Sequence, residues 1–479
     1  MAFLRVLCFS GLMALSGCGP SPTEAPTPES PPPPSEAAAT RPASAEGFQV
    51  PVEYDTLDNG LKVVISRDTT APVVTVAVYY HIGFRIEPRD RTGFAHLFEH
   101  MMFQGSENLG KMEFVQLIQG LGGSLNGSTR YDFTNYYQTV PAHRLETVLW
   151  AEADRMRGLA VTQENLVNQQ GVVKNEVKVN VLNQPYGGFP WLDLPQAANE
   201  NWYNAHNFYG DLGDLDAATL EDVRDFFHTY YAPNNAAIAI VGDVDPAEAL
   251  TLAKQYFGDI DRAELPAPAD ISEPRQEQEK NASRIDPLAP RPGIAWAYHA
   301  PARGTPEHDA MVLLDLILTD GEDSLLYQKL VKEKGFAGSV TGGINFPLGN
   351  AHNYQGPMLW TASLIHDADT SPEDVIGALD EVISGLRTET VSPEVLERAV
   401  TKFRSGFYDT LGRGTGRADL LACFALFDDD PDRINRIEAG IREVTPELML
   451  ATARPYLRPT TRTVFGVVAG AAPAAKEEG

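Results

Sequence analysis

Two histidines and a glutamate follow the order His-x-x-Glu-His at His96, Glu99 and His100. On a helix, positions i and i+4 lie on one face, so both imidazoles can bind the same metal ion. Neutral imidazole suits Zn²⁺, and a catalytic zinc has three protein ligands and one open position. Glu99 shares this face and is placed to act on a metal-bound water. The pattern reverses the His-Glu-x-x-His zinc motif; a surface helix carrying these residues by chance is the alternative.

A third metal ligand is expected further along the chain. Residues 164–177 place apolar side chains such as Leu166 and Val173 at roughly helical spacing, and Thr162 is a suitable N-cap. Glu176 falls close to the apolar side of this helix, where an unpaired carboxylate is costly to bury. An ordinary exposed acid is the alternative, because the chain has 65 Asp and Glu residues.

Three features resemble the pitrilysin/insulinase family of zinc peptidases, which are inverted zincins. They are the run from Gly93 to Gly105, Glu176 about seventy-six residues after His100, and Tyr-Tyr-Ala-Pro-Asn-Asn at 230–235 before an apolar strand. The resemblance spans about residues 50 to 470 and is greatest to the zinc-bearing subunit type among bacterial relatives of mitochondrial processing peptidase. It implies one Zn²⁺ per chain, held by His96, His100 and Glu176, with Glu99 as the general base of peptide hydrolysis.

The N-terminus has the form of a bacterial lipoprotein signal. Arg5 precedes a short apolar stretch at 6–15, and Leu-Ser-Gly-Cys at 15–18 resembles a lipobox. The stretch is too short to span a bilayer, so we expect cleavage before Cys18 and lipidation of that cysteine. A plain secretory signal is the alternative. The chain is therefore expected to be exported. It would be either anchored by lipid to a bacterial membrane, facing the periplasm, or periplasmic. Gly19 after the cysteine favours the outer membrane for the anchored form.

Charge and cysteine content limit the partners and the covalent links. The formal net charge of −27 argues against binding to nucleic acid or to anionic lipid. Of three cysteines, Cys8 leaves with the signal and Cys18 would be lipidated. Cys423 then remains alone, so we expect no intrachain disulfide and a small core residue at that position.

The sequence contains an internal duplication. Tyr-x-x-Pro at 230–233 and again at 456–459 each precede an apolar strand, and the helix at 164–177 has a counterpart beginning at Glu394. The counterpart of the zinc motif carries no ligands: Met311, Leu314 and Asp315 stand opposite His96, Glu99 and His100, and Gly406 stands opposite Glu176. The second copy therefore cannot bind zinc and is expected to have a structural or substrate-binding role.

These features predict an α+β fold with antiparallel-rich sheets. The family resemblance implies two duplicated pitrilysin-like α/β domains that form a clamshell. The expected divisions are a signal peptide at 1–17, a disordered Pro-rich tether at 18–47, an active zinc peptidase domain at 48–265, a polar linker at 266–290, an inactive homologous domain at 291–470 and a tail at 471–479.

A substrate-binding strand is expected after the zinc helix. Small residues at 122–129 precede alternating aromatic and polar residues at 131–137, which predicts a turn followed by an exposed strand. In relatives, this strand is the sheet edge to which an unfolded peptide adds as an extra strand. Asn126 and Thr129 are the candidates for substrate contact. An internal hairpin with a Tyr-rich face is the alternative.

One departure from the family bears on substrate binding. In their second half, active relatives usually carry an Arg and a Tyr seven residues apart. These two side chains hold the peptide near the zinc. Here Val331 and Gly338 occupy those positions. The chain thus resembles the zinc-bearing member of a heterodimer whose homologous, zinc-less partner supplies the clamp. Local substitution by Lys332 or Tyr327 is the alternative.

The sequence therefore predicts a zinc metalloendopeptidase that hydrolyses unfolded or short peptides with zinc-activated water. A non-catalytic peptide-binding or scaffold lipoprotein is the competing function. Mn²⁺ or Co²⁺ in place of Zn²⁺ stays open, because the ligand types do not exclude either ion.

Overall fold

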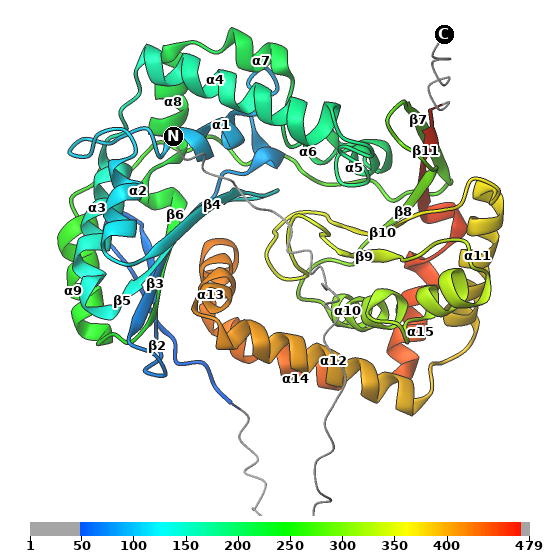
Figure 1. Ribbon diagram of the computed structural model, residues 1–479. Coiled ribbons are helices and arrows are strands. Elements are labelled where there is room, and N and C mark those ends of the chain that lie inside the picture. Colours follow the sequence, from blue (N-terminus) through cyan, green and yellow to red (C-terminus); the bar gives the residue numbers. More distant parts are fainter. Residues whose placement is uncertain (1–47, 471–479) are drawn as a thin grey trace, which may run out of the picture. The chain divides into compact units, whose positions relative to one another are not determined.

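The computed structural model describes residues 48–470 (Figure 1). The predicted signal peptide, tether, lipidation site Cys18 and C-terminal tail lie outside these residues. From Gln49 onward, the described chain belongs to one compact unit. It contains two β-sheets and many helices, so the predicted α+β class is confirmed.

The first sheet has six strands in the order β1-β2-β6-β3-β5-β4. Its strands are β1 (Glu53–Thr56), β2 (Lys62–Arg67), β3 (Val73–Tyr80), β4 (Ser124–Thr129), β5 (Thr134–Pro141) and β6 (Ala236–Gly242). Only β2 and β6 pair in parallel. The central strands β3 and β6 are nearly continuous apolar runs because both faces of this sheet are covered by helices.

The second sheet has five strands in the order β7-β11-β8-β10-β9. Its strands are β7 (Lys280–Asp286), β8 (Gly293–His299), β9 (Thr341–Ile344), β10 (Leu359–Ile365) and β11 (Arg462–Ala469). This order repeats the order β2-β6-β3-β5-β4 of the first sheet. The one parallel pair, β7 with β11, corresponds to β2 with β6. The internal duplication predicted from the sequence is therefore present in the topology.

The helices repeat in the same way. The first half of the chain contains α1 (Phe94–Met101), α2 (Glu113–Gly120), α3 (Leu145–Arg157), α4 (Gln163–Val177), α5 (Asp193–Ala198), α6 (Trp202–Ala205), α7 (Leu212–Ala217), α8 (Leu220–Tyr230) and α9 (Pro246–Phe257). The second half contains α10 (Pro306–Thr319), α11 (Pro372–Thr388), α12 (Pro393–Gly412), α13 (Gly414–Asp428), α14 (Ile437–Glu443) and α15 (Pro446–Tyr456). Helix α10 lies between β8 and β9 as α1 lies between β3 and β4, and α12 lies between β10 and β11 as α4 lies between β5 and β6.

One stretch of the predicted linker forms a strand. Residues 280–286, assigned to a linker at 266–290, form β7 at the edge of the second sheet. The polar sequence did not predict this strand because β7 is mostly exposed and its charged side chains interact with α5. Arg284 pairs with Asp193, and Lys280 donates to the backbone oxygen of Ala198.

Each sheet is covered on one face by a helix from the other half of the chain. Helix α13 packs on β3 and β6, opposite α3 and α9, whereas α5 packs on β8 and β11 (Figure 1). Leu421 and Phe424 of α13 join Tyr79 and Ala239 in one buried cluster. Cys423 is buried in the same cluster, as predicted, and burial raises the pKa of its thiol well above the usual range.

A buried ion pair and a hydrogen bond from the second half fix the turn between β4 and β5. Arg85 Nε donates to Asp132 Oδ1 over 2.6 Å, and both side chains are buried. The other carboxylate oxygen of Asp132 accepts a hydrogen bond of 2.8 Å from the backbone N–H of Gln355, in the loop before β10. The hairpin β4–β5 is thus held in position by residues of both halves.

No helix among residues 48–470 combines the length and the apolar run that crossing a bilayer requires.

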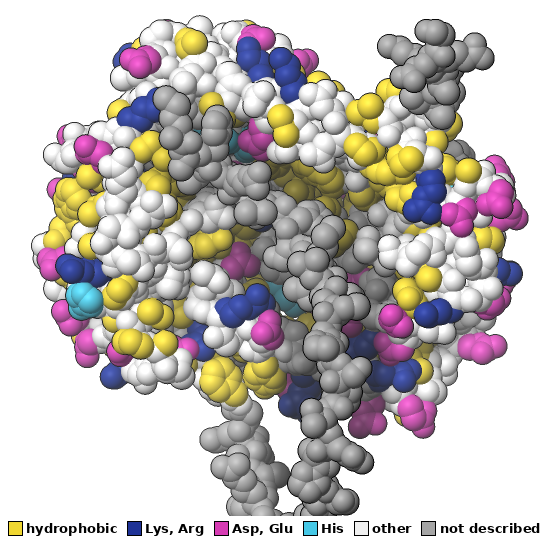
Figure 2. Space-filling view, viewed as in Figure 1, with side chains coloured by type: hydrophobic (Ala, Val, Ile, Leu, Met, Phe, Trp, Pro, Cys, Tyr) yellow, Lys and Arg dark blue, Asp and Glu magenta, His cyan; other side chains and the backbone are white. Residues whose placement is uncertain are grey.

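On the face shown in Figure 2, Asp and Glu side chains are scattered and Lys and Arg lie among them. The large negative charge is therefore not gathered into one patch on that face.

Replacing Leu421 by Ala should test how far the two halves depend on each other. Leu421 of α13 is fully buried in the cluster that also contains Tyr79 and Ala239 of the first sheet, so a cavity there should lower the free energy of unfolding by about 2–5 kcal/mol. Leu182→Ala is the matched control, since Leu182 is 59% exposed and its loss should cost less than about 0.5 kcal/mol. Urea unfolding measures both. Equal effects would contradict the role of α13.

Candidate metal centre

Helix α1 begins at a position that only glycine fits. Gly93 has a left-handed conformation with φ of 80°, and a Cβ there would lie 2.5 Å from the Tyr209 carbonyl oxygen. Buried Glu87 accepts hydrogen bonds from the backbone N–H groups of Gly93 (2.9 Å) and Ala95 (2.5 Å). A carboxylate at a helix N-terminus is favourable, so Glu87 fixes the start of the helix that carries the motif.

Helix α4 brings Glu176 to the motif. The side chain of Thr162 accepts a hydrogen bond from the Asn165 backbone N–H, which confirms it as the N-cap. Leu166 and Val173 are fully buried, and α4 packs against α1. Glu176 lies on the same side of α4 as Val173 and therefore faces α1.

The structure brings His96, His100 and Glu176 together. The two Nε2 atoms are 3.3 Å apart, and the Glu176 oxygens lie 3.7 Å from His96 Nε2 and 3.3 Å from His100 Nε2. One potential ligand atom from each residue lies within 4.8 Å of the others. Among residues 48–470, no other group of three His, Cys, Asp or Glu side chains is this compact. Tyr209 also donates a hydrogen bond of 3.3 Å to Glu176.

The cluster has the charges and donor atoms that a divalent cation needs. Burial, and then His100, lowers the pKa of His96 to about 3, so this imidazole is neutral. Burial opposes ionisation of Glu176, but His100 and His96 lower its pKa below the usual value. Two imidazole nitrogens 3.3 Å apart repel each other through their lone pairs unless a proton or a cation lies between them. Two imidazoles and a carboxylate are a ligand set that suits Zn²⁺.

The other ring nitrogen of His96, Nδ1, does not select the tautomer of this residue. Nδ1 is buried and has no hydrogen-bond partner in the described part of the chain. Histidine ligands usually donate this N–H to a carboxylate or carbonyl, which selects the tautomer. Here the selection must come from the Nε2 side, where His100 and Glu176 converge.

Glu99 lies beside the cluster with one carboxylate oxygen bound. The hydroxyl of Thr129 donates to Glu99 Oε2 over 2.8 Å. Burial raises the pKa of Glu99, although His100 and the Thr129 hydroxyl act against this rise. Strand β4 passes close by, since a Cβ added to Gly127 would lie 3.4 Å from Glu99 Cγ.

Two expectations about the substrate strand need correction. The exposed edge of the sheet is β4, whereas the Tyr-rich residues belong to β5, which is largely buried between β3 and β4. The internal hairpin describes β5 correctly. Thr129 is only 2% exposed and its hydroxyl binds Glu99, so its side chain is not free to contact substrate. Asn126 is exposed on β4.

The residues at the expected clamp positions offer no comparable groups. Val331 belongs to a π-helix at Tyr327–Glu333, and Gly338 follows it. Lys332 Nζ lies 5.4 Å from the ring centre of Tyr327 and 3.9 Å from Glu322. The two local substitutes, Lys332 and Tyr327, are therefore directed at each other.

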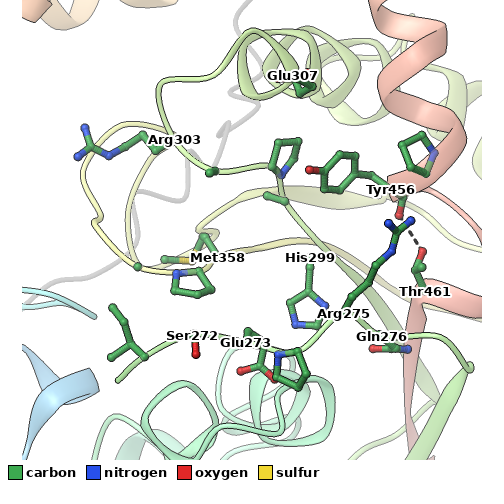
Figure 3. A pocket seen from close by; sticks show the side chains of 18 of the residues that line it. Ser272, Glu273, Arg275, Gln276, His299, Arg303, Glu307, Met358, Tyr456 and Thr461 are labelled. Atoms are coloured by element: carbon green, nitrogen blue, oxygen red, sulfur yellow. Dashed lines mark hydrogen bonds between the residues drawn. The ribbon is translucent and has the colours of Figure 1, made fainter. Parts of the chain in front are cut away.

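One large cavity lies away from the histidine cluster. A cavity of about 980 Å³ lies beside the segment 269–276, with His299, Glu273 and Arg275 among its polar side chains (Figure 3). None of His96, Glu99, His100 or Glu176 lines it. This cavity and the candidate metal site are therefore separate features of the molecule.

Two family models match the chain. "Insulinase (Peptidase family M16)" matches residues 62–186, which include all four motif residues. "Peptidase M16 inactive domain" matches residues 217–403.

Curated relatives and solved structures agree with these matches. The zinc protease PqqE of Helicobacter pylori (strain ATCC 700392 / 26695) is 26% identical over 434 residues, covering 88% of this chain and 94% of that protein. The mitochondrial-processing peptidase subunit beta of Homo sapiens is 27% identical over 214 residues, covering 44% of this chain and 43% of that subunit. The crystal structure of a protease from Helicobacter pylori has a TM-score of 0.80 at 24% identity, covering 88% of this chain and 100% of that one. The chain is therefore a relative of the pitrilysin/insulinase family of peptidases.

Proposed function

We propose that this chain is a zinc metalloendopeptidase that hydrolyses unfolded or short peptides. The observation that carries the proposal is the convergence of His96, His100 and Glu176 within 4.8 Å, with Glu99 one residue from His100. The name of the Helicobacter relative, a zinc protease, supports this reading.

The chain's own residues have distinct roles in this proposal. His96 and His100 bind Zn²⁺ through their Nε2 atoms, and Glu176 binds it through its carboxylate. When bound, Zn²⁺ supplies Lewis acidity, which polarises a carbonyl group and makes water easier to deprotonate. Glu99 accepts a proton from the attacking water and passes it to the leaving amine.

Strand β4 provides the peptide-binding edge. Its outer side has no neighbouring strand among residues 48–470, and its Gly127 lies beside Glu99. A peptide that pairs with β4 would therefore run past the general base. Backbone pairing does not depend on side chains, which accounts for a broad range of unfolded substrates. Exposed Asn126 is the candidate for side-chain contact.

A homologous, zinc-less partner would complete substrate binding. Val331 and Gly338 cannot supply the guanidinium and phenol groups that hold peptides in active relatives. The human relative is named as a subunit, in keeping with an assembly of more than one chain. We propose a heterodimer in which this chain supplies the zinc centre and the partner supplies the clamp.

The location and the division of labour follow the sequence features. We propose export to the periplasmic side of a bacterial membrane, with lipid on Cys18, an active domain at 48–265 and an inactive homologous domain at 291–470. A non-catalytic peptide-binding lipoprotein is the second candidate, favoured by the match to an inactive-domain model. That match spans residues 217–403, however, whereas all four motif residues lie before it.

Glu99→Gln should abolish peptidase activity while the protein retains its zinc. The amide cannot accept the proton, so kcat should fall by about 10²–10⁴-fold. Activity on an unfolded peptide and zinc content by mass spectrometry are the measurements. Glu164→Gln, at an exposed position on α4, is the control and should change neither quantity. Substantial activity in the Glu99 variant would remove it from this role.

Chelation should remove one Zn²⁺ per chain together with the activity, and added Zn²⁺ should restore both. Glu176→Ala should weaken zinc binding at least about 10-fold, because the third protein ligand is lost. Competition with a chromogenic chelator measures the affinity, with exposed Asn175→Ala as the neighbouring control. A purified chain with no metal, or activity that persists without metal, would instead favour the peptide-binding lipoprotein.

The purified chain alone should cleave peptides at least about 10-fold more slowly than the chain with its partner, because the clamp orients the substrate. Co-purification from the native host supplies the partner. Lys332→Ala separates the local alternative: it should leave the slow activity of the isolated chain unchanged. Full activity of the chain alone, lost in the Lys332 variant, would show that no partner is needed.

A further inference from the structure

We infer that Thr129 is a positioning residue that fixes the carboxylate of Glu99. The inference rests on the proposed function, since it assumes that Glu99 acts as the general base. It also reassigns a residue whose sequence position suggested substrate contact.

The hydrogen bond from Thr129 determines how the Glu99 carboxylate is oriented. Thr129 Oγ1 lies 2.8 Å from Glu99 Oε2 and 3.4 Å from the Ala95 carbonyl oxygen. A hydroxyl donates one hydrogen, and the shorter distance to a charged acceptor selects Glu99. Among the described residues, no other side chain or backbone group donates a hydrogen bond to this carboxylate. Without Thr129, the flexible Glu99 side chain would be free to take other rotamers.

Thr129 is itself held rigidly. It is 2% exposed at the end of β4, and a β-branched side chain has few χ1 rotamers. It pairs directly with Thr134 across the hairpin, whose turn contains Asp132. Asp132 is bound by Arg85 and by the backbone N–H of Gln355. The second half of the chain thus supports the hairpin that holds the base.

This arrangement leaves one oxygen of Glu99 free for chemistry. The hydroxyl occupies Oε2, so Oε1 can accept the proton from water. A general base must lie within hydrogen-bond reach of the proton it removes, and a misplacement of about 1 Å can cost about 10²-fold in rate. Because Thr129 belongs to β4, the base and the proposed peptide-binding strand are joined by a single hydrogen bond.

Thr129→Val, Thr129→Ser and Thr134→Val test the inference together. Valine keeps the shape of threonine but cannot donate, so kcat should fall about 10–100-fold while KM changes less than about 3-fold. Serine keeps the hydroxyl and should restore kcat to within about 3-fold of the wild type. Thr134 is the matched control: it is fully buried on the same hairpin, and its hydroxyl donates to the Ile82 carbonyl oxygen over 2.8 Å rather than to Glu99. Thr134→Val should keep the wild-type kcat.

Crystal structures of the same proteins provide a readout that does not need activity. The Glu99 carboxylate should leave its position in the Thr129→Val protein and keep it in the serine and Thr134 variants, with zinc content unchanged in all. If the valine variant does not fold, Thr129→Ala replaces it with the same expectation. An unmoved Glu99 or an unchanged kcat in the valine variant would overturn the inference, as would an equal loss in the Thr134 variant. An inactive wild type would refute the proposed function, while the position of Glu99 would still decide the inference.

Discussion

The candidate site depends on the packing of α1 against α4, which brings three metal-binding side chains from two distant segments to one point. Each helix is fixed by its own N-terminus: α1 by Glu87 and the left-handed Gly93, and α4 by Thr162. Buried apolar residues such as Leu97 and Leu166 then press the helices together. The two histidines and the glutamate cannot move apart without losing this packing, so the close approach of the two imidazole nitrogens is maintained although their lone pairs repel each other.

The two halves of the chain are joined by exchange of helices. Helix α13 from the second half covers the first sheet, and α5 from the first half covers the second sheet. The loop before β10 adds a polar connection through Asp132, which fixes the turn of the β4–β5 hairpin next to Thr129. A half without a metal site thus contributes to the geometry around Glu99. This structural contribution does not require the second half to have a catalytic role of its own.

The second copy shows how the same topology is maintained without metal. Met311 and Leu314, which the sequence duplication is expected to place opposite His96 and Glu99, are buried core residues. Asp315 stands at the position of His100, and its carboxylate accepts hydrogen bonds from Trp360 Nε1 (2.7 Å) and Thr319 (3.0 Å). Burial raises the pKa of Asp315 to about 6. In this part of α10, apolar side chains therefore pack in the core, and hydrogen bonds from Trp360 and Thr319 pair the one buried carboxylate.

The sequence by itself determined the features that depend on local spacing: the motif on a helix, the Thr162 cap, the duplication and the loss of ligands from the second copy. Glu176 could be connected to the histidines only through family resemblance, because nothing local shows which helix faces which. The tertiary structure alone decided that β4, and not the Tyr-rich β5, forms the edge, since strand order depends on pairing with β3. It also showed that β7 belongs to the second sheet, because an exposed edge strand has the polar composition of a linker. Finally, the structure showed that Thr129, expected to contact substrate, donates a hydrogen bond to Glu99. Only the fold determines which buried hydroxyl lies next to which carboxylate.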